Sequence, residues 1–573
     1  MTKSKLLFCL FSFFYAHLSA QWTTDSLQNT IIKDKADAEE TVCLSAGLPD
    51  GSTYISWYER NLTTNNYDVR LQLLSPQGNK LMGADGLLVS GERQGSGLFV
   101  SDLKADRDGN AILGFQDYRD NAAKSHCVVY KISKTGQFLW GNKGIVLHDT
   151  IFEPTSSGLA PNIGFTNAGN TIVVWAESGA RRYLAMQKIS PTGTLMWTEN
   201  RRVRDTAATA TRRFSRGTAV PAGADDFLLH FVRETGSGLG VSTMFCNRFD
   251  ASGQPLWRDK LVSNKTIGFS HRPSVLPDGS GGFYVAFNSG HPTSAALNDV
   301  WVQRIKADSS AWTTDGVEMA EAAGVHKILV NTQVLPNRNE VWTLFHVLNS
   351  AQSLSGFTVQ KTDTLGNRLL GTNGKEIFPI AAVNTDYVIG YDFRATSDGL
   401  IALYEQDGTF NKEKLYAFKV NFNGVLQWVK SISKVESGKG RGTLGIFGAN
   451  QVVAVWQDMR LSSGGGIYAQ NVNNAGVVGA RVGVQEPPSI HTASLYPNPS
   501  VKTETPTLLL DLKASDWLDI QVVDVNARVL YQKHQFYTAG QQNIPLSMPT
   551  YFTGFYMVNI KTKDGIKTLK AVR

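Results

Sequence analysis

Acidic and basic side chains recur together at the ends of four short apolar runs, in the segments WYER, FQDYRD, WAESGARR and WQDMR. An acid and an arginine two residues apart on a β-strand lie on the same face, so they could form a bidentate pair that fastens the following loop. The alternative is a role in an active site. The residues concerned are Glu59 and Arg60, Asp117 and Arg119, Glu177 and Arg181, and Asp458 and Arg460.

Repetition favours the scaffold role for these charged residues, because a single active site breaks a repeat and does not follow it. Four corresponding segments, HFVRE, AFNSG, FHVLN and YEQDG, lack the pair. This asymmetry indicates that one side of the molecule differs from the other and hints at a binding face without locating it.

Motifs with a defined chemistry are missing from the sequence. It contains no H-E-x-x-H, G-x-S-x-G or phosphate-binding loop, and no G-x-G-x-x-G after a strand. The segment DLKADRDGN (102–110) resembles a calcium loop but lacks the distal glutamate and suits a hairpin turn. We therefore predict no cofactor and no metal.

The charged pairs belong to a repeat of about 57 residues, marked first by a short turn that contains glycine. Successive turns are 52 to 60 residues apart. Ser309 takes the glycine position in one of them. The turn residues are Gly78, Gly136, Gly193, Gly253, Ser309, Gly366, Gly424 and Gly476.

An aromatic residue at the end of an apolar run keeps the same period. Asp-Gly dipeptides precede several of these runs, and such dipeptides supply the positive φ of a hairpin turn. Each repeat then contains four short antiparallel strands, which make one propeller blade. The sequence predicts an all-β protein with an eight-bladed β-propeller over residues 21–484. An array of separate sandwiches is the alternative. The aromatic residues are Trp57, Phe115, Trp175, Phe231, Phe287, Phe345, Tyr404 and Trp456.

Tryptophan follows the turn in five repeats, and this third series explains why QWTTD (21–25) resembles AWTTD (311–315). Counting back one period from Met82, which fills the tryptophan position, leads to Trp22. The N-terminal segment thus corresponds to the last strand of a repeat, whereas the final repeat lacks its tryptophan. We expect this segment to close the ring by pairing with strands from residues 440–475. Without such closure the first and last blades would expose strand edges.

Glutamine stands six residues before the turn glycine, or its substitute, in five repeats. A recurring amide on a buried strand predicts a structural hydrogen bond between neighbouring blades, with ligand binding as the alternative. The residues are Gln72, Gln187, Gln303, Gln360 and Gln470.

The ends of the chain predict export. Residues 1–20 combine two lysines, an apolar core and a small-residue cleavage site, as in a secretory signal peptide. No later segment is apolar enough to span a bilayer.

The remaining cysteines, Cys43, Cys127 and Cys246, fit no metal motif and are expected to be buried. The net charge of +7 falls mostly at the two ends, so we predict no nucleic-acid partner.

A separate module follows a proline-containing linker at residues 485–493. The segments YPNPS, VVDVNARVL and GFYMVNI and the terminal KTLKAVR resemble the type A sorting domain of the type IX secretion system of Bacteroidota over residues 494–573. The strand pattern predicts an Ig-like sandwich. The resemblance implies that the secretion machinery is a partner and that the protein is secreted or attached to the outer-membrane surface. Ala527 departs from the glycine that is frequent in the family.

The repeats, and VVAVWQDMRLSSGGGIYAQNV above all, resemble those of bacterial extracellular propellers, a likeness that names no activity. The sequence favours a binding or adhesion module for a glycan or a protein. A secreted lyase or glycosidase with carboxylates in the channel is the alternative, and a structural surface-layer component is a third.

Overall fold

The β-like runs form strands because their β-branched and aromatic side chains suit a pleated, half-buried surface. The chain divides into two compact units, residues 1–480 and 481–573. The computed structural model describes residues 22–35, 38–94, 100–119, 125–151, 161–178, 182–205, 212–235, 241–268, 272–290, 297–380, 387–407, 411–447, 451–461, 464–479, 489–524, 528–562 and 565–573. The expected signal peptide, residues 1–20, and linker residues 485–488 lie outside this description.

Four-stranded antiparallel sheets make up the first unit, and in the first four of them the strand order follows the chain. The first sheet contains β2 (Glu40–Gly47), β3 (Thr53–Asn61), β4 (Asn66–Leu74) and β5 (Leu87–Ser90), and the second β6 (Ser101–Ala105), β7 (Ala111–Asp117), β8 (Ser125–Ile132) and β9 (Ile145–Ile151). The third contains β10 (Asn162–Phe165), β11 (Thr171–Ser178), β12 (Arg182–Ile189) and β13 (Arg201–Val203), and the fourth β14 (Arg213–Pro221), β15 (Phe227–Thr235), β16 (Val241–Phe249) and β17 (Pro255–Leu261).

Three more sheets repeat this order, and the last one of the unit departs from it. The regular ones contain β18 (Ser274–Pro277), β19 (Phe283–Gly290), β20 (Asn298–Ile305) and β21 (Val317–Glu318); β22 (His326–Leu335), β23 (Glu340–Leu348), β24 (Ser355–Asp363) and β25 (Lys375–Phe378), with the 3-10 helix Pro336–Arg338; and β26 (Tyr387–Ala395), β27 (Gly399–Asp407), β28 (Lys414–Asn421) and β29 (Leu426–Ser433). The last one has the order β1 (Thr30–Lys33), β32 (Gly466–Asn473), β31 (Gln451–Asp458) and β30 (Lys439–Phe447).

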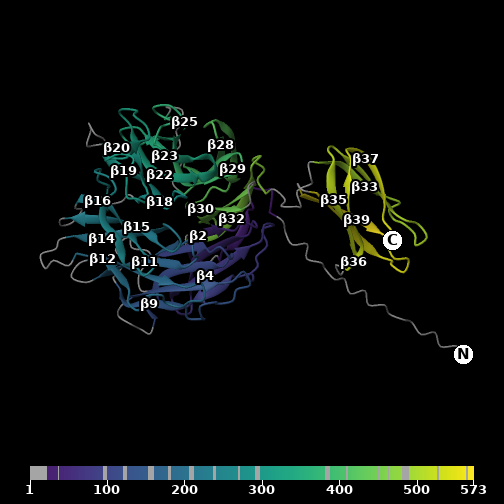
Figure 1. Ribbon diagram of the computed structural model, residues 1–573, viewed down its shortest axis with the longest axis horizontal. Coiled ribbons are helices and arrows are strands. Elements are labelled where there is room, and N and C mark those ends of the chain that lie inside the picture. The colour runs from purple at the N-terminus through teal and green to yellow at the C-terminus, as the bar shows by residue number, and fades with distance from the viewer. Residues whose placement is uncertain are drawn as a thin grey trace. The chain divides into compact units, whose positions relative to one another are not determined.

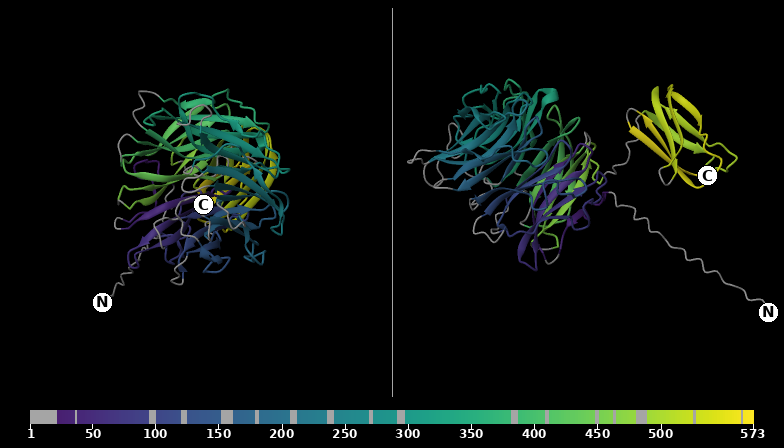
Figure 2. Two further views of the ribbon diagram at one scale, coloured as in Figure 1. Left: turned by 90° about the vertical axis from the view of Figure 1, so that its left-hand side faces the viewer. Right: turned by 60° about the horizontal axis from the view of Figure 1, so that its bottom comes forward.

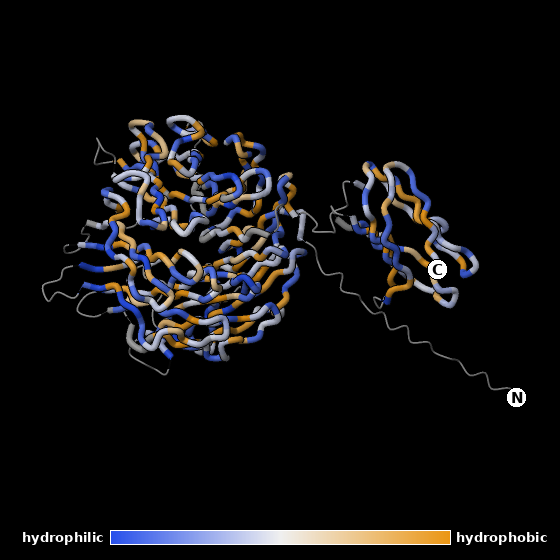
Figure 3. The backbone as a smooth tube through the Cα atoms, in the orientation of Figure 1, coloured by the Kyte–Doolittle hydropathy of each residue, from blue (hydrophilic) through white to orange (hydrophobic). Residues whose placement is uncertain are grey.

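Consecutive sheets of this unit share hydrophobic cores. One cluster joins Leu71 of β4 to Phe115 of β7, another joins Trp197 to Phe227 of β15, and five further clusters connect successive sheets as far as Tyr468 of β32. Burial stabilises such a side chain by about 1.5–3 kcal/mol, and a sheet without its neighbour would lose this contribution. Sheets follow one another around the unit in Figures 1 and 2, and hydrophobic stretches run along their strands in Figure 3. This arrangement is a β-propeller.

Tryptophan side chains link each of five repeats to the next one along the ring. Each indole Nε1–H donates to the carbonyl two residues before the turn glycine of the following repeat, over 2.9 to 3.4 Å. At Gly78 (φ +85°) an added Cβ would lie 2.9 Å from the Trp22 ring, so this turn requires glycine for its conformation and for space. The donor and acceptor residues are Trp22 and Pro76, Trp140 and Pro191, Trp197 and Ala251, Trp312 and Thr364, and Trp428 and Asn474.

The N-terminal segment completes the last sheet of the first unit, as the repeat count predicts. Strand β1 pairs antiparallel with β32, with Thr30 opposite Ala469. The amide of Gln470 donates to the Thr23 carbonyl over 2.7 Å, which matches the 2.6 Å bond from Gln303 to Thr313 in a regular repeat. Figure 1 shows β30 and β32 beside β2 of the first sheet. The segment after Trp22 thus supplies the fourth strand of the last sheet, which the final repeat lacks.

The recurring glutamines are buried and hydrogen-bonded to the backbone. Gln303 reaches the preceding sheet at the Val262 carbonyl (3.1 Å), and Gln360 does so at the Met319 carbonyl (3.2 Å). The hydrogen bonds of Gln72 stay within its own repeat, where its side chain accepts from the Met82 N–H (2.8 Å). The expected bridging role therefore applies to Gln303 and Gln360, while Gln72 holds the segment after its own turn.

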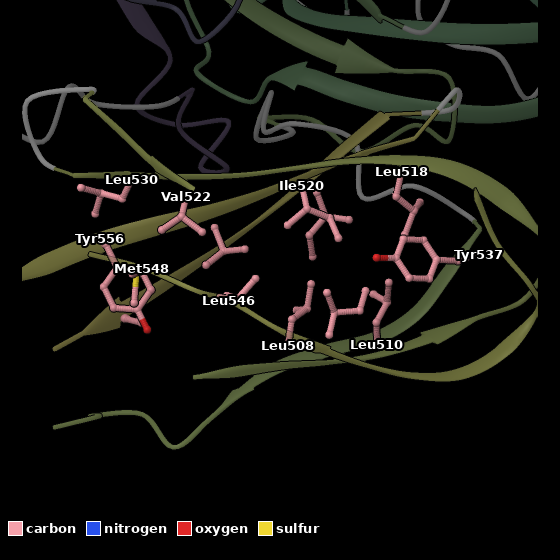
Figure 4. Packing of buried hydrophobic residues seen from close by; sticks show 14 of the residues in the cluster. Leu508, Leu510, Leu518, Ile520, Val522, Leu530, Tyr537, Leu546, Met548 and Tyr556 are labelled. Carbon is pink, nitrogen blue, oxygen red and sulfur yellow. The ribbon is translucent and has the colours of Figure 1, made fainter. Parts of the chain in front are cut away.

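Two sheets enclose the core of the second unit. A three-stranded sheet has the order β33 (Ile490–Tyr496), β34 (Thr507–Leu512) and β37 (Gly540–Pro545); a four-stranded one has the order β36 (Val529–Tyr537), β35 (Asp516–Asp524), β38 (Phe555–Thr562) and β39 (Gly565–Val572). Leu508 and Leu510 of β34 point toward Ile520 of β35 in Figure 4, and all three are buried. Residues 490–493, which the sequence places in the linker, belong to β33 because buried Ile490 pairs with Leu512.

The three cysteines lie in the protein interior, as the sequence predicts. Cys43, Cys127 and Cys246 are buried and outside any disulfide, and burial raises the pKa of the Cys127 and Cys246 thiols. Among the residues that the structure describes, no helix is long and apolar enough to cross a membrane.

Candidate functional site

Asp117 and Arg119 form the bidentate pair that their spacing suggests. Arg119 Nε and Nη2 donate to the two carboxylate oxygens over 2.9 and 2.7 Å, and both side chains are buried. Its Nη1 donates to the Lys143 carbonyl over 2.8 Å. Burial acts to lower the pKa of Arg119, but the Asp117 carboxylate outweighs it and raises that pKa. The pair fastens the end of β7 to the chain segment before β9.

Asp458 lies at the centre of a larger buried network at the end of β31. It accepts from Arg460 Nη2 (2.6 Å), Lys439 Nζ (2.9 Å) and the Trp456 indole (2.9 Å). Arg460 Nη2 also donates to Asn29 Oδ1 over 3.0 Å. Burial favours the neutral acid, but the hydrogen bonds from Arg460 and the charge of Lys439 hold the pKa of Asp458 at about 2. This network connects the last sheet to the N-terminal segment.

Glu59 and Arg60 do not combine in this way. Adjacent residues on a strand point to opposite faces, and Arg60 Nη2 donates to Asn65 Oδ1 over 2.8 Å at the surface. Glu59 is buried and pairs with Lys35 Nζ (2.6 Å) and Arg70 Nε (3.3 Å). The acid therefore occupies the repeated position, but its partners come from other segments.

Glu177 pairs with an arginine other than the expected one. It accepts from the Trp175 indole over 3.1 Å and lies 3.4 Å from Arg202 Nε. Arg181, expected beside it, lies outside the described residues. In all four repeats the carboxylate is buried and bonded within the protein, which is the environment of a scaffold residue.

Substituting Asp458 tests this structural role. We expect Asp458→Asn to lower the free energy of unfolding by about 3–5 kcal/mol, because Lys439 and Arg460 would stay buried without a counter-charge. Urea unfolding followed by tryptophan fluorescence measures the change. Asp308→Asn, at an exposed turn, is the matched control and should leave the midpoint unchanged. Equal midpoints for both variants would contradict the assignment.

Glu40 is a buried carboxylate that the sequence reading passed over. It stands opposite Glu59 in the pairing of β2 with β3, and its Oε2 accepts from the Lys35 N–H over 3.2 Å. Its Oε1 is buried without a hydrogen-bond partner among the described residues. Burial, with a smaller contribution from the charge of Glu59, raises the pKa of Glu40 to about 7.

This raised pKa makes stability depend on pH. The folded protein holds the Glu40 proton up to about pH 7, whereas the unfolded chain releases it near the ordinary glutamate pKa of 4.5. Stability from this group is present below about pH 4.5 and is lost as the pH rises to about 7, by at most about 3 kcal/mol. We expect Glu40→Gln to remove that dependence, measured by urea unfolding at both ends of this range. Glu376→Gln, at an exposed site, should keep the wild-type slope.

An arginine-rich groove lies between the third and fourth sheets. It encloses about 310 Å³ and is lined by β13, β17 and the ends of β14, β15 and β16. Its lining, which we call the arginine groove, consists of Arg201, Arg202, Val203, Arg204, Asp205, Arg212, Phe214, Arg233, Asn247, Phe249, Gly253, Gln254, Pro255, Arg258 and Asp259.

The sequence contained a signal for this groove. Residues 201–216 include six arginines, a local run that a chain-wide net charge conceals. None of the eight predicted charged residues lines it. Among the described residues, no cluster of three or more His, Cys, Asp or Glu side chains could hold a metal ion.

Comparison with known families decides the nature of the second unit. Residues 494–572 match the family model of the secretion system C-terminal sorting domain. The second unit is a type IX secretion sorting domain. A sorting domain at this position indicates that the protein is secreted or attached to the outer-membrane surface.

The propeller that accompanies the sorting domain has remote structural likenesses. A polysaccharide lyase of family PL25, an ulvan lyase bound to -[GlcA(1-4)Rha3S]-, is 11% identical over 72% of this chain and 96% of its own, with a TM-score of 0.42. The polysaccharide lyase Uly1 is 9% identical over 78% and 99% (TM-score 0.41).

The β-propeller domain of the Trilobed protease from Pyrococcus furiosus, described as having an open velcro topology, is 8% identical over 69% of this chain and 95% of its own, with a TM-score of 0.38. A search of curated proteins gave no match. The propeller assignment follows from the strand pairing and the shared cores of the first unit.

Proposed function

We propose that the protein is an exported eight-bladed β-propeller that binds an extracellular glycan. In this proposal residues 1–20 are a signal peptide, residues 21–484 form a ring closed by the N-terminal strand, and an Ig-like sorting domain carries the propeller to the secretion machinery. The strand order β1-β32-β31-β30 supports the closed ring. Two facing sheets around one core support the Ig-like description.

The arginine groove is the observation that carries the binding function. Its volume of about 310 Å³ lies at the lower end of the range for ligand sites. The run of six arginines at residues 201–216, part of which lines the groove, is not a feature of the repeat, as expected of a site that occurs once in a ring of similar sheets. The repeated carboxylates are instead occupied by internal bonds, so we assign Asp117, Glu177 and Asp458 to the scaffold.

A glycan array of the mature chain tests this function. We expect binding to a restricted set of glycans, without turnover of the bound sugar in a reducing-end assay. Absence of binding to every glycan, together with capture of a protein ligand, would replace this proposal with protein adhesion.

A second candidate, a lyase or glycosidase, is favoured by one observation. Glu40 stands opposite Glu59 and has a pKa of about 7, as a general acid requires. Both side chains are buried, and Glu59 is ion-paired, which places them out of reach of a polymer in this conformation. Release of new reducing ends or unsaturated sugars by the wild type but not by Glu40→Gln would establish the enzyme.

A further inference from the structure

The arginine groove has a strong excess of positive charge. Its lining contains six arginines and only two aspartates, a formal excess of four charges in one cavity. The propeller region outside the two chain ends carries little net charge, so this concentration is local. A closely spaced set of guanidinium groups attracts anions and repels cations.

Aromatic contacts hold two of these guanidinium groups in place. Arg233 lies over the Phe245 ring, 3.6 Å from its centroid, and Arg201 lies 5.8 Å from the centroid of Trp197. Stacking fixes the plane of a guanidinium and leaves its N–H edges available to an acceptor. Arg201 Nε is buried and has no acceptor among the described residues.

Two further arginines face solvent with no ion pair among the residues that the structure describes. Arg204 and Arg258 are both exposed. Arg212, in contrast, forms an ion pair with Asp205, with 3.5 Å between Nη1 and Oδ2. Burial and then repulsion from Arg212 lower the pKa of Arg233. A bound anion would relieve this repulsion.

We propose that the arginine groove binds an anionic polysaccharide, whose sulfate or carboxylate groups accept paired hydrogen bonds from the guanidinium groups. This inference rests on the proposed glycan-binding function and specifies its ligand class. Planar forks of N–H donors match the oxygens of such groups. An extracellular protein meets charged polysaccharide, whereas a nucleic-acid duplex is bound by a long basic stripe and not by one local cavity.

Polymers of different charge provide the test, and two of them, dextran sulfate and neutral dextran, share one backbone. Binding of the mature full chain to dextran sulfate, polygalacturonate, neutral dextran and duplex DNA is measured by calorimetry at about 0.05 M and about 0.3 M salt. The double variant Arg204→Gln/Arg258→Gln removes two exposed groove charges. The control double variant Lys143→Gln/Lys430→Gln removes two exposed charges elsewhere.

We expect the wild type and the control variant to bind at least one of the two anionic polysaccharides and to show no binding to neutral dextran. The groove variant should bind about tenfold more weakly, with a smaller salt dependence. Sulfate and carboxylate are distinguished by which polymer binds more tightly. Equal affinity of the groove variant and the control would overturn the site, and tighter binding of DNA would overturn the ligand class. Binding of neutral glycans alone, unaffected by the groove variant, would refute this inference while leaving the proposed function intact.

Discussion

Deletion of residues 21–35 lowers the free energy of unfolding of the propeller by at least about 5 kcal/mol. The deletion removes buried Trp22 and Ile32, each of which contributes about 2–5 kcal/mol, together with the pairing of β1 to β32. It also withdraws Asn29 from Arg460 and exposes the edge of β32. Urea unfolding followed by tryptophan fluorescence measures the loss, and aggregation of the truncated protein is expected as well.

Two single substitutions separate the parts of this effect. Trp22→Ala leaves β1 in place and removes the indole bond to Pro76, so it should cost about 3–5 kcal/mol. Ile31→Ala, on the same segment but 46% exposed, should cost less than about 1 kcal/mol. A truncated protein that unfolds at the wild-type midpoint would show that the ring does not depend on its N-terminal strand.

Removal of residues 490–573 leaves the protein in the periplasm of the producing cell. The cut precedes β33, because this strand already begins at Ile490 and belongs to the sorting domain. The cut removes the sorting domain, through which we expect the secretion machinery to recognise the chain. Fractionation and protease treatment of intact cells measure the change, with most of the wild-type protein found outside the cell or on its surface.

The truncated propeller should remain folded, which separates loss of sorting from loss of structure. The hydrophobic cluster of the second unit contains only residues from 490 to 571, so its removal leaves the cores of the propeller intact. An unchanged urea midpoint of the periplasmic protein is the control. Appearance of the truncated protein outside intact cells would contradict the role of the domain.

The repeated features could be predicted from the sequence because each one appears several times at one spacing. The position of Trp22 in the tryptophan series predicted the pairing of β1 with β32, across more than 430 residues. A single-copy feature gives no such signal. The partners of Glu59, Lys35 and Arg70, come from a loop and a neighbouring strand, and only the folded sheet brings them together.

The arginine groove was missed in the sequence for a related reason. Its charges come from β13, from Arg212 before β14 and from β15 and β17, so they are spread over nearly 60 residues of sequence. The net charge of the chain sums these arginines with acidic residues elsewhere and so conceals their local concentration. The dense run in residues 201–216 was visible, but its meaning depended on β15 and β17, which bring Arg233 and Arg258 beside part of that run.

Closure between the two ends of the propeller imposes an order on its biosynthesis. Thr30 leaves the ribosome well before its partner Ala469, by roughly 20 to 90 s at ordinary translation rates. During that interval the nascent N-terminal strand has no strand to pair with, and its unpaired backbone amides can bind strands of other chains. A protein built this way gains from holding chaperones that delay folding until translocation is finished, and we expect their depletion to cause aggregation before it slows secretion.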